Sequence, residues 1–221
     1  MTNTLIPFWD MANHDNGEMS TDFNDDSDST VCMAQKDFEP GQQFTIFYGV
    51  RANIDLLVHN GFVFEANNED CLTLKLGLSK NDSLALQKLA FLEELNIPRT
   101  GLFFIGPLTK EKPLDPALLA FLRVLCMTST DLEEHKDAIK KLLENDNNNL
   151  SELDKRVYGY LQTRCQLLLK SYPTDLQEDL ELLKTRNPSQ KFHFAVLLRS
   201  KEKVMLQGAI NYCQSILTTC A

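Results

Sequence analysis

Several features that assign a protein to a broad class are missing from this sequence of 221 residues. Its longest apolar runs fall well short of the roughly 18 residues that a membrane-spanning helix needs, so no membrane partner is expected. No basic residue precedes Lys36, and neither a signal peptide nor a mitochondrial presequence is visible. The six cysteines include no Cys-x-x-Cys pair, which predicts free, mostly buried thiols rather than a disulfide framework or a zinc site. A reducing compartment follows, the cytoplasm first and the nucleus second.

Basic residues are scarce at the start of the chain. Residues 1–48 carry nine acidic side chains against one lysine, whereas the remainder carries 22 acidic and 21 basic side chains. Binding to a nucleic-acid backbone draws on clustered Lys and Arg. The charge distribution therefore predicts no nucleic-acid partner.

The most acidic stretch, residues 21–30, has little to bury apart from Phe23. Its alternating acidic and amide residues follow the ligand spacing of a calcium loop: Asp22, Asn24, Asp26 and Asp28. Such a loop needs Gly at its sixth position and Glu at its twelfth, where this chain has Ser27 and Met33. A solvated loop without metal is the better interpretation.

Short apolar segments surround this loop. The run Leu5–Trp9 contains the single tryptophan and is interrupted by Pro7, which favours an extended entry or edge strand over a helix. Asn13–Gly17 has the composition of a turn. Two strands are expected at Val31–Ala34 and Gln43–Phe47.

A turn at Pro40-Gly41 separates the two expected strands, and Phe47-Tyr48-Gly49 ends the second. Asn53 is then a candidate N-cap for a short helix, which Gly61 would end.

Two of these segments carry a resemblance to a known family. Residues 5–17 read Leu-Ile-Pro-Phe-Trp-Asp-Met-Ala-Asn-His-Asp-Asn-Gly, and residues 47–49 read Phe-Tyr-Gly. Together they resemble the end of a SET domain, the fold of a large family of S-adenosylmethionine-dependent protein methyltransferases. The longer segment is similar in particular to the actin-histidine N-methyltransferases. The resemblance implies actin as the protein substrate.

The resemblance also implies which residues bind the cofactor. Asn13 and His14 would hold S-adenosylmethionine, and Tyr48 would place its hydroxyl beside the transferred methyl group as the catalytic residue. The rival interpretation of His14 is a metal ligand or a general base. The sequence offers no second histidine nearby, which argues against a metal site. No metal is therefore expected.

The substrate would lie against another set of residues. In this branch Trp9 and Asp10 line the substrate pocket, where Asp10 could accept a hydrogen bond from an imidazole nitrogen. Arg51 is the candidate for binding the substrate backbone. Asn60 stands where the resemblance leads one to expect a small serine.

The identity of the methylated residue remains open between histidine and lysine. Methyl transfer from a sulfonium is a one-step displacement that depends mainly on positioning. A lysine, with a reference pKa of about 10.4, must lose a proton before it attacks, whereas an imidazole near about 6.5 is already largely neutral. A carboxylate such as Asp10 suits the tautomer control that a histidine needs, but a protein-lysine methyltransferase stays an alternative.

After residue 70 the pattern changes from short strands to helices. Cys71–Leu76 alternates like a half-buried strand, and helices follow. Their expected starts are Asn81 or Asp82, Asp115-Pro116, Thr130 with Glu133, Ser151, Thr174 with Gln177, and Ser189. The first two helices would bury the leucine stripes Leu86, Leu89, Leu92 and Leu95, and Leu118, Leu119, Leu122 and Leu125. The third would run to about Glu144 and break at Asp146–Asn149, and the last would reach about Leu217.

The expected fold is therefore α+β, with two parts. Residues 1–70 would be the C-terminal end of a β-rich SET domain, and residues 71–221 a mostly helical domain that resembles the Rubisco methyltransferase-type substrate-binding domain. A SET domain of this family begins well over a hundred residues earlier, so we expect a fragment or a short isoform. The alternative function is a catalytically inactive fragment that acts as a protein-binding module.

Overall fold

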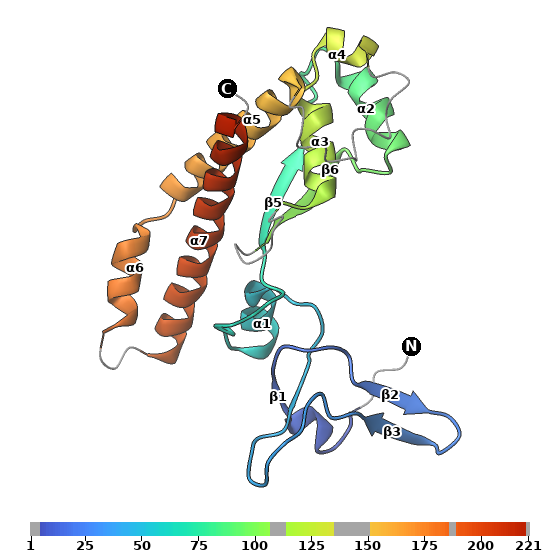
Figure 1. Cartoon of the computed structure of the whole chain (residues 1–221), viewed down its shortest axis with the longest axis vertical. Coiled ribbons are helices and arrows are strands. Elements are labelled where there is room, and N and C mark those ends of the chain that lie inside the picture. Colours follow the sequence, from blue (N-terminus) through green and yellow to red (C-terminus); the bar gives the residue numbers. More distant parts are fainter. Residues whose placement is uncertain (1–4, 107–113, 135–150, 186–188, 220–221) are drawn as a thin grey trace. The chain divides into compact units, whose positions relative to one another are not determined.

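The computed structural model describes residues 5–106, 114–134, 151–185 and 189–219 (Figure 1). The chain divides into two compact units, residues 1–69 and residues 70–221. Short strands and one helix form the first unit, and helices with a two-stranded sheet form the second. The predicted α+β class is confirmed. Within the described part of the chain, no helix is both long and apolar enough to cross a membrane.

The first unit begins with a 3-10 helix, η1 (Trp9–Met11), so the extended entry expected up to Trp9 is wrong at its end. The cause is a set of short-range bonds around Pro7. The Asp10 carboxylate accepts the N–H of Ile6 at 2.7 Å, and the Asp10 N–H donates to the Ile6 carbonyl at 3.1 Å. These two bonds close one turn of chain.

A parallel strand pair follows, which the sequence did not indicate. β1 (Asn13–His14) pairs with β4 (Thr45–Ile46), with Asn13 opposite Thr45 and His14 opposite Ile46. The expected turn over residues 13–17 is therefore wrong at its first two residues. Local composition favoured a turn, whereas the observed strand depends on a partner about 30 residues later in the chain.

The acidic stretch forms an antiparallel hairpin of β2 (Thr21–Asn24) and β3 (Ser29–Cys32), not the expected solvated loop. Asn24 stabilises its turn, because Oδ1 accepts the N–H groups of Asp26 and Ser27 at 3.0 and 3.1 Å. β3 thus covers only part of the strand expected at residues 31–34, and it pairs with β2.

The turn and the helix that follow agree better with expectation. Gly41 has φ +88°, and the Gln42 N–H donates to the Glu39 carbonyl at 3.0 Å, which confirms the Pro-Gly turn. α1 (Asn53–Asn60) ends at Gly61, whose φ is +81°, as predicted. Asn53 is not the N-cap.

The reason lies in the burial of Asn53. Its side chain is completely buried, and Oδ1 accepts the N–H of Phe64 at 2.9 Å. The carbonyl oxygen of the amide therefore bonds the segment after α1 instead of the helix's own first turn. Ala52 holds the N-cap position without a side-chain hydrogen bond.

The second unit is built on an antiparallel pair, β5 (Leu72–Gly77) and β6 (Thr100–Ile105). β5 matches the predicted strand and buries Leu74 and Leu76. β6 was missed, since its run of four apolar residues has no visible alternation although burial alternates along it.

α2 (Ala85–Glu94) and α3 (Pro116–Cys126) pack against each other. Asp115 caps α3 as predicted, accepting the N–H of Ala117 at 2.9 Å. The expected stripe is confirmed at Leu118, Leu119 and Leu122, which are buried. In α2 the stripe is wrong at Leu86, which is 85% exposed.

α4 (Ser129–Glu134) has its capping residue at Thr128, two positions before the predicted Thr130. Thr128 and Asp131 form its capping pair. The Thr128 hydroxyl accepts the Asp131 N–H, and the Asp131 carboxylate accepts the Thr128 N–H. The predicted continuation to Glu144 and the break at Asp146–Asn149 lie outside the described residues.

The last three helices are α5 (Glu152–Lys170), α6 (Leu176–Leu183) and α7 (Gln190–Thr219). α7 lies beside both α5 and α6 (Figure 1). The predicted helix starts at Ser151 and Ser189 are confirmed, but the capping box expected at Thr174 lies one residue later, at Asp175 with Glu178.

One hydrophobic core joins the sheet and most helices of the second unit. Leu161 and Leu206 are fully buried within it, as are the thiols of Cys165 and Cys213. The other described cysteines are half-buried, so the expectation of mostly buried thiols holds for two of the five. Cys220 lies outside the described residues.

Candidate functional site

The parallel pair β1–β4 brings the two motif segments together in the first unit. Since His14 lies opposite Ile46, Tyr48 emerges two residues beyond the paired position. Its backbone N–H donates to Nδ1 of His14 at 3.3 Å, and the two ring centroids are 5.2 Å apart. The contact makes the two motifs one local structure.

Aromatic rings surround His14. Its ring lies 5.0 Å from that of Phe64, 5.8 Å from that of Phe47 and 6.2 Å from that of Phe62, centroid to centroid. Burial is the main cause that lowers the pKa of His14, and it outweighs the opposing hydrogen bond to the Ile46 backbone. A neutral imidazole can accept the Tyr48 N–H at Nδ1, so burial and hydrogen bonding favour the same protonation state.

Tyr48 is fixed at its backbone and at its hydroxyl. The hydroxyl donates to the Ala12 carbonyl at 2.6 Å, just before β1. Gly49 has φ +93°, a conformation that residues with a Cβ rarely adopt, and it turns the chain toward α1. The Phe-Tyr-Gly motif thus ends in a glycine for a backbone reason.

Tyr48 lines an open cavity of about 460 Å³, which we call the Tyr48 hollow. Its lining residues are Trp9, Asp10, Ala12, Met19, Thr21, Ile46, Phe47, Tyr48, Arg51 and Asn60. Four of the six predicted site residues therefore meet at one cavity. Of the other two, His14 contacts Tyr48, and Asn13 is an exposed strand residue that does not line the hollow.

The predicted substrate residues differ in how firmly they are held. The Trp9 ring lies 6.5 Å from the ring of Phe44, so Trp9 both packs and lines the hollow. Asp10 is exposed, and its carboxylate accepts the Ile6 N–H. Arg51 donates from Nη1 to Oδ1 of Asn60 at 3.1 Å.

Asparagine side chains hold the segments around this site together. The sequence indicated them only as turn residues or not at all. Asn67 donates from Nδ2 to the Arg51 carbonyl at 2.8 Å, and Asn16 donates from Nδ2 to the Ala66 carbonyl at 2.8 Å. Asn16 Oδ1 also accepts the N–H of Asn68 at 3.1 Å. For Asn67 the available signal was its place in a pair of asparagines after α1, and composition does not distinguish a buried amide from a turn.

Metal-ligand side chains do not cluster in the described residues: no group of three or more His, Cys, Asp or Glu is placed to hold an ion there. The hairpin residues that resembled a calcium loop include Asn24, whose Oδ1 is already bonded to the backbone of its own turn.

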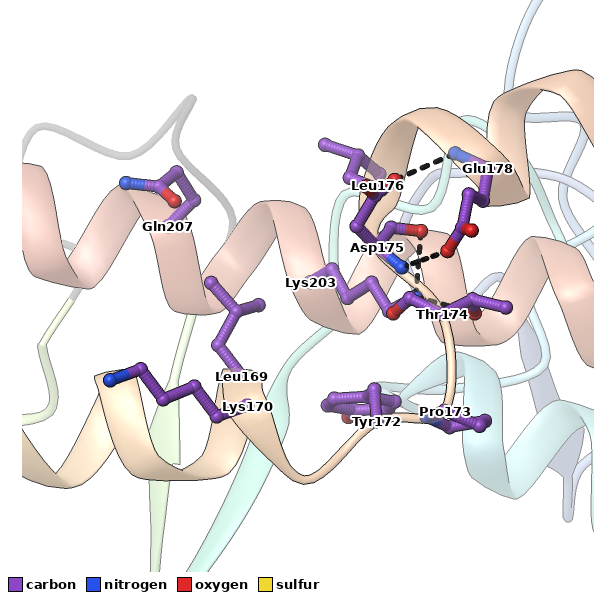
Figure 2. A pocket seen from close by; sticks show the side chains of 10 residues that line it. All are labelled: Leu169, Lys170, Tyr172, Pro173, Thr174, Asp175, Leu176, Glu178, Lys203 and Gln207. Atoms are coloured by element: carbon purple, nitrogen blue, oxygen red, sulfur yellow. Dashed lines mark hydrogen bonds between the residues drawn. The ribbon is translucent and has the colours of Figure 1, made fainter.

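A second cavity, of about 490 Å³, lies in the helical unit between the α5–α6 connection and α7 (Figure 2). Figure 2 shows Lys203 extending from α7 toward Thr174. Its ammonium is buried and donates to Thr174 Oγ1 at 3.0 Å, to the Asp175 carbonyl at 3.0 Å and to Asp179 Oδ2 at 2.5 Å. Arg199 also donates to both carboxylate oxygens of Asp179.

The predicted resemblance is confirmed by comparison with curated proteins. Actin-histidine N-methyltransferases of Homo sapiens, Rattus norvegicus and Rhinolophus ferrumequinum are each 38% identical to this chain over 217 residues. Each alignment covers 96% of this chain and 36% of the relative. The chain thus spans about a third of the length of these relatives.

Solved structures share the fold of this chain, and a sequence family matches part of it. Rubisco LSMT bound to sinefungin and monomethyllysine is similar with a TM-score of 0.76 and 25% identity, over 96% of this chain and 49% of that one. The SET domain of LSMT bound to MeLysine and AdoHcy is similar with a TM-score of 0.78 and 23% identity, over 98% of this chain and 50% of that one. The family described as Rubisco LSMT substrate-binding matches residues 79–206. That match covers more than half of the sequence, and the chain therefore belongs to the Rubisco LSMT substrate-binding family.

Proposed function

We propose that this chain supplies part of an S-adenosylmethionine-dependent protein N-methyltransferase that acts on a histidine of actin. The observation that carries the proposal is the Tyr48 hollow, where Trp9, Asp10, Tyr48 and Arg51 meet. The 38% identity to actin-histidine N-methyltransferases, extending over 96% of this chain, supports the choice of acceptor and substrate. The two units would be the C-terminal part of the SET domain (residues 1–70) and the substrate-binding domain (residues 71–221).

The residues present fit one end of the cofactor. The hollow's volume lies within the range of about 300–1,000 Å³ that small-molecule sites occupy. The aromatic faces of Trp9 and Tyr48 suit a sulfonium cation. Tyr48 in the hollow, with Asn13 and His14 on the adjoining strand β1, would hold S-adenosylmethionine, which when bound would supply an electrophilic methyl group.

Side chains of the protein itself would position the reacting groups, orient the substrate and exclude water. Tyr48, held by its bonds to His14 and Ala12, would position the reacting groups in line. Asp10 would accept a hydrogen bond from one imidazole nitrogen of the substrate and thereby keep the other nitrogen unprotonated and nucleophilic. Trp9 would exclude water from one side of the hollow.

A lysine acceptor is the second candidate. Similar solved structures contain lysine or its methylated forms. A lysine ammonium would have to lose a proton first, and desolvation in an aromatic-walled hollow would favour that loss. The exposed Asp10 carboxylate opposes it, because a nearby negative charge stabilises the ammonium.

A binding module without catalysis is the third candidate, and a specific observation favours it. Residues 70–221 form a compact unit with its own core, and the family match lies within it. Such a unit could bind a protein while the first unit remains inactive.

For location and further partners we propose the cytoplasm first and the nucleus second, without nucleic-acid or membrane partners. The support is the sequence alone: six scattered cysteines without a Cys-x-x-Cys pair, and nine acidic side chains against one lysine in residues 1–48.

Calorimetric titration of S-adenosylmethionine into the 221-residue chain tests the proposal. Saturable binding that weakens in Tyr48→Ala, but not in the control Tyr160→Ala on the exposed side of α5, is the expected result. Methyl transfer to an actin peptide, compared with the same peptide carrying Lys for the target His, then separates the two acceptors. Absence of cofactor binding together with a cooperative helical melt would favour the binding module.

A further inference from the structure

Asn60, at the C-terminal end of α1, contacts Arg51 through its side chain. Its Oδ1 accepts a hydrogen bond from Nη1 of Arg51 at 3.1 Å, and both residues line the Tyr48 hollow. Asn60 is the last residue of α1 and lies nine positions after Arg51. The bond therefore spans the whole helix and joins its two ends beside the hollow.

The backbone of Arg51 is fixed separately. Its carbonyl accepts from Nδ2 of Asn67 at 2.8 Å, and the same Nδ2 lies 3.5 Å from Oδ1 of the fully buried Asn53. An arginine held only at its backbone would sample many rotamers. With Asn60 bound to one end of the guanidinium, both the start and the tip of the Arg51 side chain are positioned.

The helix does not need this bond for its own end. Gly61, in the left-handed conformation, donates its N–H to the Leu57 carbonyl and ends α1. The Asn60 side chain is exposed, so its removal leaves no buried amide without a partner. A role in helix capping therefore does not account for the contact.

We infer that Asn60 is a positioning residue that orients the guanidinium of Arg51 to bind an acceptor oxygen of the protein substrate beside the methylated residue. The inference rests on the proposed function. A guanidinium carries five N–H donors in one plane, so a bond at Nη1 sets the direction of the others. The acceptor is an oxygen atom of the substrate, either of a main-chain carbonyl or of a side-chain carboxylate.

The positioning itself is measurable without any substrate. In NMR spectra of the 221-residue chain, the Arg51 guanidinium should show slowed rotation about its Nε–Cζ bond, and Asn60→Ala should abolish the slowing. Asn68→Ala is the matched control, because Asn68 is exposed and its backbone N–H, not its side chain, donates to Asn16 Oδ1. Identical Arg51 dynamics in wild type and Asn60→Ala would overturn the inference.

Peptide binding then tests what Arg51 does. We expect Asn60→Ala to weaken binding of a histidine-containing peptide about fivefold when Arg51 is present, and to have no effect in an Arg51→Ala background. Equal losses in both backgrounds would mean that Asn60 does not act through Arg51, which contradicts the inference.

Two peptides distinguish the acceptor. One carries Glu on both sides of the central His, and the other carries Ala. A larger loss on Arg51→Ala for the Glu peptide assigns a carboxylate, and equal losses assign a main-chain carbonyl. If the wild-type chain binds neither peptide, the proposed function fails together with the substrate contact, while the NMR comparison still decides whether Asn60 positions Arg51.

Discussion

The backbone N–H of Tyr48 donates a hydrogen bond to Nδ1 of His14 across 3.3 Å, and this bond joins positions that are 34 residues apart in the chain. It gives the histidine of the Asn-His pair a structural role in addition to any contact with a cofactor. The bond requires an unprotonated Nδ1, so the geometry of Tyr48 depends on the charge of His14.

The first prediction concerns pH. Because burial lowers the pKa of His14 in the folded chain, the unfolded chain binds the proton more readily. The stability that His14 contributes is therefore complete above its unfolded pKa, about 6.5, and is lost as pH falls from there through the folded value. Urea denaturation between pH 7.5 and pH 5 should show the first unit becoming less stable, with Trp9 fluorescence as the probe.

The control for this prediction removes the titrating group. In His14→Gln the loss of stability below pH 6.5 should be smaller than in wild type. An unchanged pH dependence would show that other groups cause it, and the role given to the His14 imidazole would be wrong.

The second prediction concerns the Tyr48 hydroxyl, which donates to the Ala12 carbonyl at 2.6 Å. Tyr48→Phe removes this bond and should lower the free energy of unfolding of the first unit by about 0.5–1.5 kcal/mol. Trp9 fluorescence reports this unit, since Trp9 is the only tryptophan, and far-UV circular dichroism mainly reports the helical unit. Tyr160→Phe in α5 is the control and should leave the Trp9 transition unchanged.

Local signals in the sequence predicted some elements of this fold well. Asp115-Pro116, Ser151 and Gly61 mark helix ends at the observed places, because capping involves residues only a few positions apart. The alternation in Cys71–Leu76 predicted β5 for the same reason, because every second side chain of a strand points to the same face.

Elements that depend on distant partners were not predictable in this way. β1 is a strand only because Thr45 and Ile46 lie beside it, and Asn13 and His14 alone have turn composition. Asn53 has the composition of a cap, yet its amide bonds Phe64 across the segment after α1.

The candidate site shows the same division between local and distant information. Its aromatic and charged residues came from a resemblance in short motifs. The contact of Asn60 with Arg51, and the contact of Asn67 with the Arg51 carbonyl, join residues 9 and 16 positions apart and have no local sequence pattern.

The third prediction concerns Glu202 on α7, which accepts a hydrogen bond from the Tyr172 hydroxyl at 2.7 Å. Burial raises the pKa of Glu202, more than the Tyr172 bond lowers it, and the charge of Asp70 adds to the rise. A carboxyl with a raised folded pKa contributes stability that is complete below its unfolded value and is lost as pH rises through the folded value.

Glu202→Gln should therefore flatten this part of the pH dependence. Thermal melts followed by circular dichroism between pH 4.5 and pH 8 should show a smaller fall in Tm for the variant than for wild type. Glu133→Gln, on the exposed side of α4, should behave like wild type. An equal or steeper fall in Glu202→Gln would contradict the role given to the half-buried Glu202 carboxyl.

The fourth prediction concerns Asp179, a fully buried carboxylate between two cations on α7. Burial alone would raise its pKa, but hydrogen bonds from Arg199, Lys203 and Thr174 together outweigh burial and lower the pKa below its ordinary value. Its contribution to stability is thus present above the ordinary pKa of an aspartate and is lost only as pH falls through the lowered value.

Asp179→Ala should lower the free energy of unfolding of the helical unit by about 3–5 kcal/mol, because it leaves the buried ammonium of Lys203 without its carboxylate. Glu181→Gln is the matched control on the same helix: its partner Lys184 is exposed, so no measurable change is expected. Urea denaturation followed by circular dichroism at pH 7 measures both variants. Equal effects of the two substitutions would mean that the buried cluster does not stabilise the packing of α6 on α7, and Lys203→Met in the Asp179→Ala background would then show no recovery of stability. Recovery in that double variant is the expected result, since it removes the unpaired charge that makes the single substitution costly.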